Sequence, residues 1–81
     1  MLKEALEHLV RGLVSAPDRV RVREYNNRRG QNLEVQVASD DVGKVIGRQG
    51  RTAQALRTVI NALTDNHVRV DFTDRRQRRS R

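Results

Sequence analysis

The stretch Val42-Gly43-Lys44-Val45-Ile46-Gly47-Arg48-Gln49-Gly50-Arg51-Thr52 organises this chain. It places two glycines three residues apart, where a short apolar helical turn stops and a longer amphipathic helix begins. Glycine suits a backbone that turns sharply or comes close to a ligand, because no Cβ blocks positive φ. The first N–H groups of the following helix have no partner within it and carry the positive end of its dipole. The segment therefore predicts a tight turn that can receive an anion.

The charges around this turn indicate which anion it would receive. No acidic residue occurs between Val42 and Asn61, whereas four basic ones do: Lys44, Arg48, Arg51 and Arg57. This placement favours phosphate, and hence a clamp on a strip of nucleic acid. A Gly-x-x-Gly spacing alone is equally compatible with a connector that merely turns the chain, so the context has to decide.

The size and composition of the chain favour a binding module over an enzyme. Eighty-one residues without cysteine make one small domain that packing alone must hold together, with little room for a deep enzymatic cleft. No apolar run is long enough to span a bilayer. His8 and His67 lie far apart, with no cysteine or paired carboxylates around them, which argues against a metal site or an acid–base centre. We expect a cytoplasmic, non-catalytic protein with no cofactor, no metal and no membrane insertion.

The net charge of +7 is concentrated at one end of the chain. Residues 75–81 contain five arginines and no acid, whereas residues 1–74 carry twelve basic and ten acidic side chains. We expect residues 1–74 to form the domain and residues 75–81 to be a disordered basic tail. Such a tail would add nonspecific, salt-sensitive attraction to a polyanion.

Hydrophobic periodicity predicts the order helix, strand, strand, helix, helix, strand. We expect helices over residues 2–14, 42–47 and 51–64, and strands over residues 19–23, 33–38 and 68–73. The first two strands should form an antiparallel hairpin, and the long connection to the third permits a right-handed parallel crossover. Residues 39–41 offer N-caps for the short helix. The pattern predicts an α+β fold with a three-stranded mixed sheet packed against three helices.

Several side chains can be assigned to the core or the surface from this pattern. We expect Phe72 in the core, together with Ile46, Leu56, Val59 and Ile60. The arginines at positions 19, 21 and 23 form either a solvated outer strand face or an RNA-contacting one. Because Phe72 and Tyr25 are the only aromatic residues, base stacking would be scarce and sequence preference weak or degenerate.

The segment Val45-Ile46-Gly47-Arg48-Gln49-Gly50 resembles the Val-Ile-Gly-x-x-Gly signature of KH domains. The expected element order is similar to the type II, prokaryotic arrangement of that fold, and the resemblance covers residues 1 to about 74. More narrowly, residues 41–47 and 50–53 resemble the solitary bacterial KH proteins of the KhpA, or YlqC-like, RNA-binding family.

The resemblance implies that about four nucleotides of single-stranded RNA lie in a groove, gripped by the glycine loop and set against an apolar floor. It assigns RNA contacts to Lys44, Val45, Ile46, Gly47, Arg48, Gln49, Gly50, Arg51 and Thr52. It assigns the floor of the groove to Val42, Val45, Ala53 and the strand that contains Val35. An RNA chaperone or post-transcriptional regulator is the function that follows.

Two other functions remain open at this stage. Similar bacterial proteins pair with themselves or with a larger KH-containing partner linked to cell-envelope growth and cell shape, so the chain could be an interaction subunit, as a homodimer or heterodimer. A ribosome-associated assembly factor would share the RNA chemistry and differ in its target.

Overall fold

The computed structural model describes residues 2–28, 30–65 and 67–74. The basic tail lies outside these residues, so its expected disorder stays a prediction. The elements follow one another as α1 (Leu2–Arg11), β1 (Arg21–Asn27), β2 (Gly30–Val37), α2 (Val42–Ile46), α3 (Arg51–Ala62) and β3 (Val68–Asp74). Short 3-10 turns precede β1, α2 and α3, at Pro17–Arg19, Ser39–Asp41 and Arg48–Gly50. The expected order of helices and strands is confirmed.

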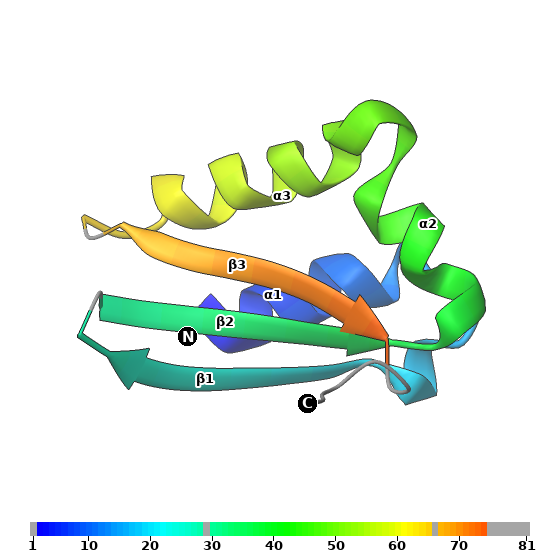
Figure 1. Ribbon diagram of the computed structural model, residues 1–81, viewed down its shortest axis with the longest axis horizontal. Helices are drawn as coiled ribbons and strands as arrows, with labels where there is room; N and C mark the ends of the chain where they lie inside the picture. Colours follow the sequence, from blue (N-terminus) through cyan, green and yellow to red (C-terminus); the bar gives the residue numbers. More distant parts are fainter. Residues whose placement is uncertain (1, 29, 66, 75–81) are drawn as a thin grey trace.

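The three strands form one mixed sheet in the order β1-β2-β3 (Figure 1). β1 pairs with β2 antiparallel, and β2 pairs with β3 parallel, as expected from the hairpin and the long crossover. Val35 in the central strand lies opposite Val22 on one side and Phe72 on the other. Because side chains alternate across a strand, this register gathers the apolar residues on one face.

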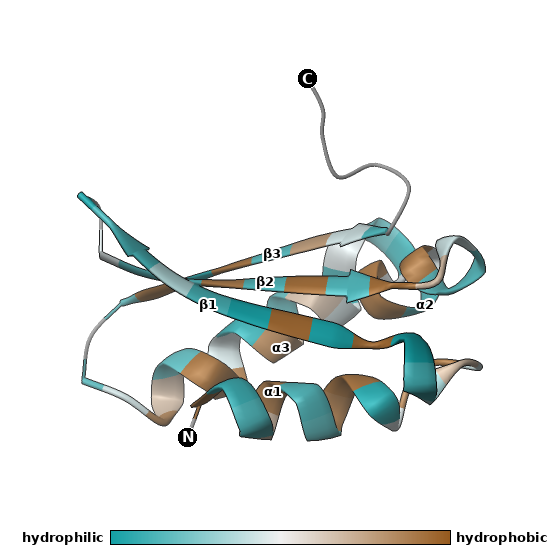
Figure 2. Cartoon of the chain, turned by 90° about the horizontal axis from the view of Figure 1, so that it is seen from below, coloured by the Kyte–Doolittle hydropathy of each residue, from teal (hydrophilic) through white to brown (hydrophobic). Residues whose placement is uncertain are grey.

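The helices lie along that apolar face (Figure 2). α1 and α3 run along it in roughly the direction of the strands, and α2 closes the end at which β2 and β3 finish (Figure 1). Twelve buried residues form the core cluster: Leu6, Val10, Val20, Val22, Leu33, Val35, Val37, Val45, Leu56, Ile60, Val68 and Val70. The core therefore fixes α2 and α3 against the sheet, and with them the turn that joins these two helices.

Some element bounds differ from the expected ones. α1 ends at Arg11 rather than residue 14, because Gly12 follows and glycine costs about 1 kcal/mol within a helix. β1 begins at Arg21 rather than residue 19, because Pro17 opens a 3-10 turn there. The hairpin is also longer than expected, and its last pair joins Asn27 to Gly30.

The expected burial of Val59 is wrong, since its side chain is 43% exposed. Leu56 and Ile60 are buried as expected, while Ile46 and Phe72 pack against the core from partly buried positions. Adjacent helical residues point about 100° apart, so the face that buries Ile60 turns Val59 toward solvent.

Candidate nucleic-acid interface

The glycine turn between α2 and α3 has a left-handed backbone. Gly47, Gln49 and Gly50 have φ values of 79°, 56° and 77°. Among the described residues, Gln49 is the only one other than glycine with a positive φ. A side chain in this conformation costs about 1–2 kcal/mol, so the surrounding contacts must hold the turn in shape.

The two glycines are required for different reasons. A Cβ atom on Gly47 would lie 2.8 Å from the backbone nitrogen of Thr52, which leaves no room for a side chain. A Cβ on Gly50 would meet nothing within 4 Å, so only its φ calls for glycine. Hydrogen bonds close the turn, because the Gly47 amide donates to the Gly43 carbonyl at 2.8 Å and the Gly50 amide donates to the Gly47 carbonyl at 3.1 Å.

Two arginines and one glutamine project from this turn. Arg48, Gln49 and Arg51 are exposed. Within residues 2–28, 30–65 and 67–74, no carboxylate forms an ion pair with Arg48 or Arg51. Their charges are therefore available to an anionic ligand at this end of the molecule.

Lys44 is engaged differently from these arginines. Its ammonium lies 3.6 Å from the carboxylate of Asp41 and hydrogen-bonds to the hydroxyl of Ser15. The side chain is still 51% exposed, so a phosphate could reach it. Because Asp41 offsets its charge, Lys44 attracts an anion less than Arg48 or Arg51 does.

Asp41 is buried and lies at the start of α2. Its two carboxylate oxygens accept hydrogen bonds from the backbone amides of Ser15 and Ala16, at 3.0 and 3.1 Å. The Ser15 bond is the main cause that lowers the pKa of the Asp41 carboxyl, helped by Ala16 and Lys44 and opposed by burial. These contacts tie the segment after α1 to the start of α2.

This arrangement corrects the expected role of residues 39–41. Asp41 occupies the N-cap position of α2, but its side chain makes no capping hydrogen bond. The carboxylate turns instead to two amides that are 25 and 26 residues away in sequence. Two hydrogen bonds from partly buried backbone amides to a charged carboxylate contribute more to stability than one helix cap.

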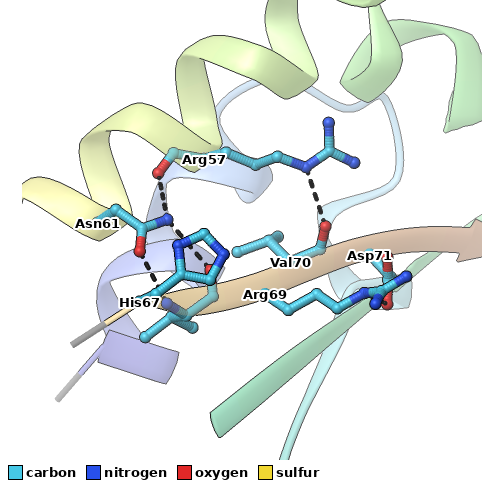
Figure 3. A pocket seen from close by; sticks show the side chains of 7 residues that line it. Arg57, Asn61, His67, Arg69, Val70 and Asp71 are labelled. Atoms are coloured by element: carbon cyan, nitrogen blue, oxygen red, sulfur yellow. Dashed lines mark hydrogen bonds and ion pairs between the residues drawn. The ribbon is translucent and has the colours of Figure 1, made fainter. Parts of the chain in front are cut away.

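The free edge of β3 faces α3 and is covered by two of its side chains (Figure 3). Asn61 accepts from the Val68 amide at 2.7 Å and donates to the Val68 carbonyl at 3.1 Å. Arg57 donates from Nε to the Val70 carbonyl at 3.0 Å. Backbone N–H and C=O groups left unpaired on an edge strand can pair with other chains. Asn61 and Arg57 occupy three of these groups, which are the N–H and C=O of Val68 and the C=O of Val70.

A cavity of about 330 Å³ opens beside this edge (Figure 3). Seven residues from α3, β3 and the segment between them line it: Arg57, Asn61, His67, Val68, Arg69, Val70 and Asp71. Arg69 and Asp71 form an ion pair across 3.5 Å. The cavity therefore has polar walls with one charged side chain, Arg57, that no acid among the described residues neutralises.

The floor residues assigned from the family resemblance differ in how much surface they present. Val35 and Val45 are fully buried, and Ala53 is 2% exposed. These three support the surface from within the core. Val42 and Ile46 are partly buried, so they are the aliphatic side chains of α2 that a ligand beside the loop would meet.

Three residues at this interface were missing from the sequence-based assignment of the site. Asp41 was treated as a helix cap, Asn61 was not considered, and Arg57 was counted only among the basic residues near the turn. Their contacts join positions 7 to 26 residues apart. Helical spacing places Arg57 and Asn61 on one face of α3, but only the fold shows that this face meets β3.

The structure offers few other sites. Among the residues it describes, no three His, Cys, Asp or Glu side chains are grouped so that they could hold a metal ion. No helix within the described part of the chain is both long and apolar enough to cross a membrane.

A three-stranded mixed sheet, three helices and a Gly-x-x-Gly turn between α2 and α3 define a type II KH domain. The family model for the KhpA/KhpB KH domain matches residues 3–73, so the chain belongs to that family. It is 62% identical to a Streptomyces coelicolor protein over 74 residues, which are 91% of this chain and 94% of the relative. It is 55% identical to one from Mycobacterium tuberculosis over 71 residues, 88% and 89% of the two chains. Both are named RNA-binding protein KhpA.

Proposed function

We propose that this chain is a non-catalytic RNA-binding protein that holds about four nucleotides of single-stranded RNA beside the turn between α2 and α3. The observation that carries the proposal is a turn of fixed left-handed shape that exposes Arg48 and Gln49. Its neighbour Arg51 is also exposed and unpaired with any described acid. The names of the relatives, RNA-binding protein KhpA, point to the same ligand.

In this proposal the sugar–phosphate backbone lies against the turn. The amides of Gly47, Gly50 and Arg51 already donate to carbonyls within the segment. We therefore assign the amide contacts to Arg48 and Gln49, with the guanidinium groups of Arg48 and Arg51 on neighbouring phosphates. Lys44 stands at the edge of this contact, because Asp41 shares its charge.

The bases would extend from the turn over α2 and along the face that α3 and β3 share. Val42 and Ile46 offer aliphatic surface near the turn, and the cavity beside Arg57 lies further along α3. Contacts of this kind depend little on base identity, which suits an RNA chaperone or a post-transcriptional regulator. A ribosome-associated assembly factor would use the same contacts on a different RNA.

The test replaces both exposed residues of the turn, Arg48→Asp with Gln49→Asp, and measures binding of an eight-nucleotide uridine-rich RNA by fluorescence anisotropy. We expect affinity to fall at least tenfold, because two negative charges replace the phosphate contact. The matched control, Arg28→Asp with Gln36→Asp, changes the net charge equally at positions away from the turn. If the turn variant folds and binds RNA as strongly as the wild type, the proposed phosphate contact at the turn is wrong.

A second candidate function, pairing with another chain, is favoured by exposed apolar side chains on the helical layer. Leu9 and Leu13 are 37% and 41% exposed, and Val59 and Leu63 are 43% and 60% exposed. We propose that a second copy of the chain covers these residues, with a larger KH-containing protein as the alternative occupant. Light scattering at several concentrations, with and without RNA, tests this. A doubled mass that Leu63→Asp abolishes supports pairing, and a constant monomer mass rejects the homodimer.

A further inference from the structure

We infer that Arg57 selects the nucleobase that enters the cavity between α3 and β3, favouring bases that present two adjacent hydrogen-bond acceptors. This inference rests on the proposed RNA groove and adds to it a preference at one position. A single-strand binder with few aromatic residues would otherwise read sequence weakly.

The guanidinium group of Arg57 is held in place on the edge strand. Its Nε donates to the Val70 carbonyl at 3.0 Å, and its Cζ lies 5.5 Å from the centre of the Phe72 ring. Its two terminal amino groups point away from the Val70 carbonyl (Figure 3). No acid within the described residues pairs with them, so these donors are oriented and available.

Three other polar side chains of the cavity, Asn61, Arg69 and Asp71, are committed elsewhere, while the exposed His67 forms no hydrogen bond or ion pair among the described residues. Asn61 uses its amide nitrogen on the carbonyls of Arg57 and Val68, and its oxygen accepts from the Val68 amide. Arg69 pairs with Asp71. Arg57 is therefore the lining side chain that combines free donors with an orientation held by defined contacts.

The cavity lies within reach of the proposed phosphate contact. Arg57 lies seven positions after Gly50 along α3, which at 1.5 Å per residue is a rise of about 10 Å. That distance falls within the span of the four or so nucleotides that a KH domain holds. A volume of about 330 Å³ suits a single base.

The donor pattern of a fixed guanidinium decides which bases fit. Two parallel N–H groups match guanine, whose O6 and N7 are adjacent acceptors, and cytosine, whose O2 and N3 are adjacent acceptors. Adenine and uracil place a donor beside each acceptor on their hydrogen-bonding edges, so one N–H of the arginine would face another donor. We therefore expect guanine or cytosine to be preferred over adenine or uracil.

The experiment places one G, C or A within an eight-nucleotide uridine host, at each internal position in turn, and measures affinity for the full chain. At the best position we expect G or C to bind roughly tenfold more tightly than A or U. Arg57→Lys keeps the charge but loses the planar fork, so this preference should fall to within twofold while the salt dependence is unchanged. Arg19→Lys, the matched control at an exposed arginine outside the proposed groove, should leave the preference intact.

Two results would overturn the inference: equal wild-type affinity for all four bases at every position, or a G or C preference that survives Arg57→Lys. Equal wild-type affinity for all four bases rejects the inference even if Arg57→Lys does not fold, and in that case Arg57→Gln takes the place of the lysine variant. The turn variant Arg48→Asp with Gln49→Asp separates this result from the proposed function. If that variant loses all RNA binding while the wild type shows no base preference, the groove stands and only the role of Arg57 fails.

Discussion

A Cβ atom added to Gly47 would lie 2.7 Å from the Cβ of Thr52, so the first glycine of the turn packs directly on the first turn of α3. This contact sets the distance between the end of α2 and the start of α3. The second glycine has open space around it. The shape of the loop therefore depends more on Gly47 than on Gly50.

Gly47→Ala should lower the free energy of unfolding by about 3 kcal/mol, because it adds a steric clash to a strained φ. Gly50→Ala, the matched control, keeps its φ strain but meets no atom, so we expect a loss of only about 1–2 kcal/mol. Urea unfolding followed by circular dichroism measures both. Equal losses in the two variants would show that the contact with Thr52 does not constrain the turn.

Asp41→Asn should lower the melting temperature at neutral pH by roughly 5 °C or more. An amide has one acceptor oxygen where the carboxylate has two, so one of the amides of Ser15 and Ala16 loses its partner. Differential scanning calorimetry measures this loss. A variant as stable as the wild type would mean that the two hydrogen bonds contribute nothing to the fold.

The same carboxylate predicts a dependence on pH. The pKa of Asp41 is lower in the folded protein than in the unfolded chain, where it is about 3.9. Its contribution to stability is therefore complete above about pH 4 and is lost as the pH falls through the lower, folded-state pKa. The stability difference between wild type and Asp41→Asn should be constant from pH 7 to pH 5 and narrow below pH 4. A difference that does not change with pH contradicts this reading.

Asn61→Ala should destabilise the protein by about 1–3 kcal/mol, because it removes both hydrogen bonds that cover the β3 edge at Val68. Gln54→Ala, at an exposed position of the same helix, should change stability by less than about 0.5 kcal/mol. Chemical denaturation compares the two. If both variants unfold at the same denaturant concentration, solvent satisfies the strand edge as well as Asn61 does.

The salt dependence of RNA binding should distinguish Arg51 from Lys44. Each phosphate contact with a single strand contributes about 0.7 to the slope of log affinity against log salt. Arg51→Gln should reduce the slope by about that amount. Lys44→Gln should reduce it by less, since Asp41 already offsets the lysine charge. Identical reductions would show that the ion pair opens when RNA binds.

The order of elements and the position of the glycine turn could be predicted from the sequence because both depend on local signals. Helical spacing, strand alternation and the Gly47 to Gly50 interval are all read within a few residues. The burial of Val59 was not predictable in this way, because both it and Ile60 are apolar and only the packed structure decides which one faces the sheet.

The polar contacts that shape the candidate site could not be predicted from local sequence patterns. Asp41 meets the amides of Ser15 and Ala16, and Arg57 meets the carbonyl of Val70. Each of these contacts joins a side chain to backbone that is distant in sequence. A sequence shows which residues carry charge, but the fold decides which of them are left to a ligand.

The most direct test of the RNA groove is a map of amide chemical shifts in the ¹⁵N-labelled protein as a short uridine-rich RNA is added. RNA held against the turn should produce the largest changes at Gly47 to Thr52, with further changes along α3 and the β3 edge around Arg57 and Val70. Changes confined to the open face of the sheet, at Arg21, Arg23 and Tyr25, with none at the turn, would contradict this binding mode.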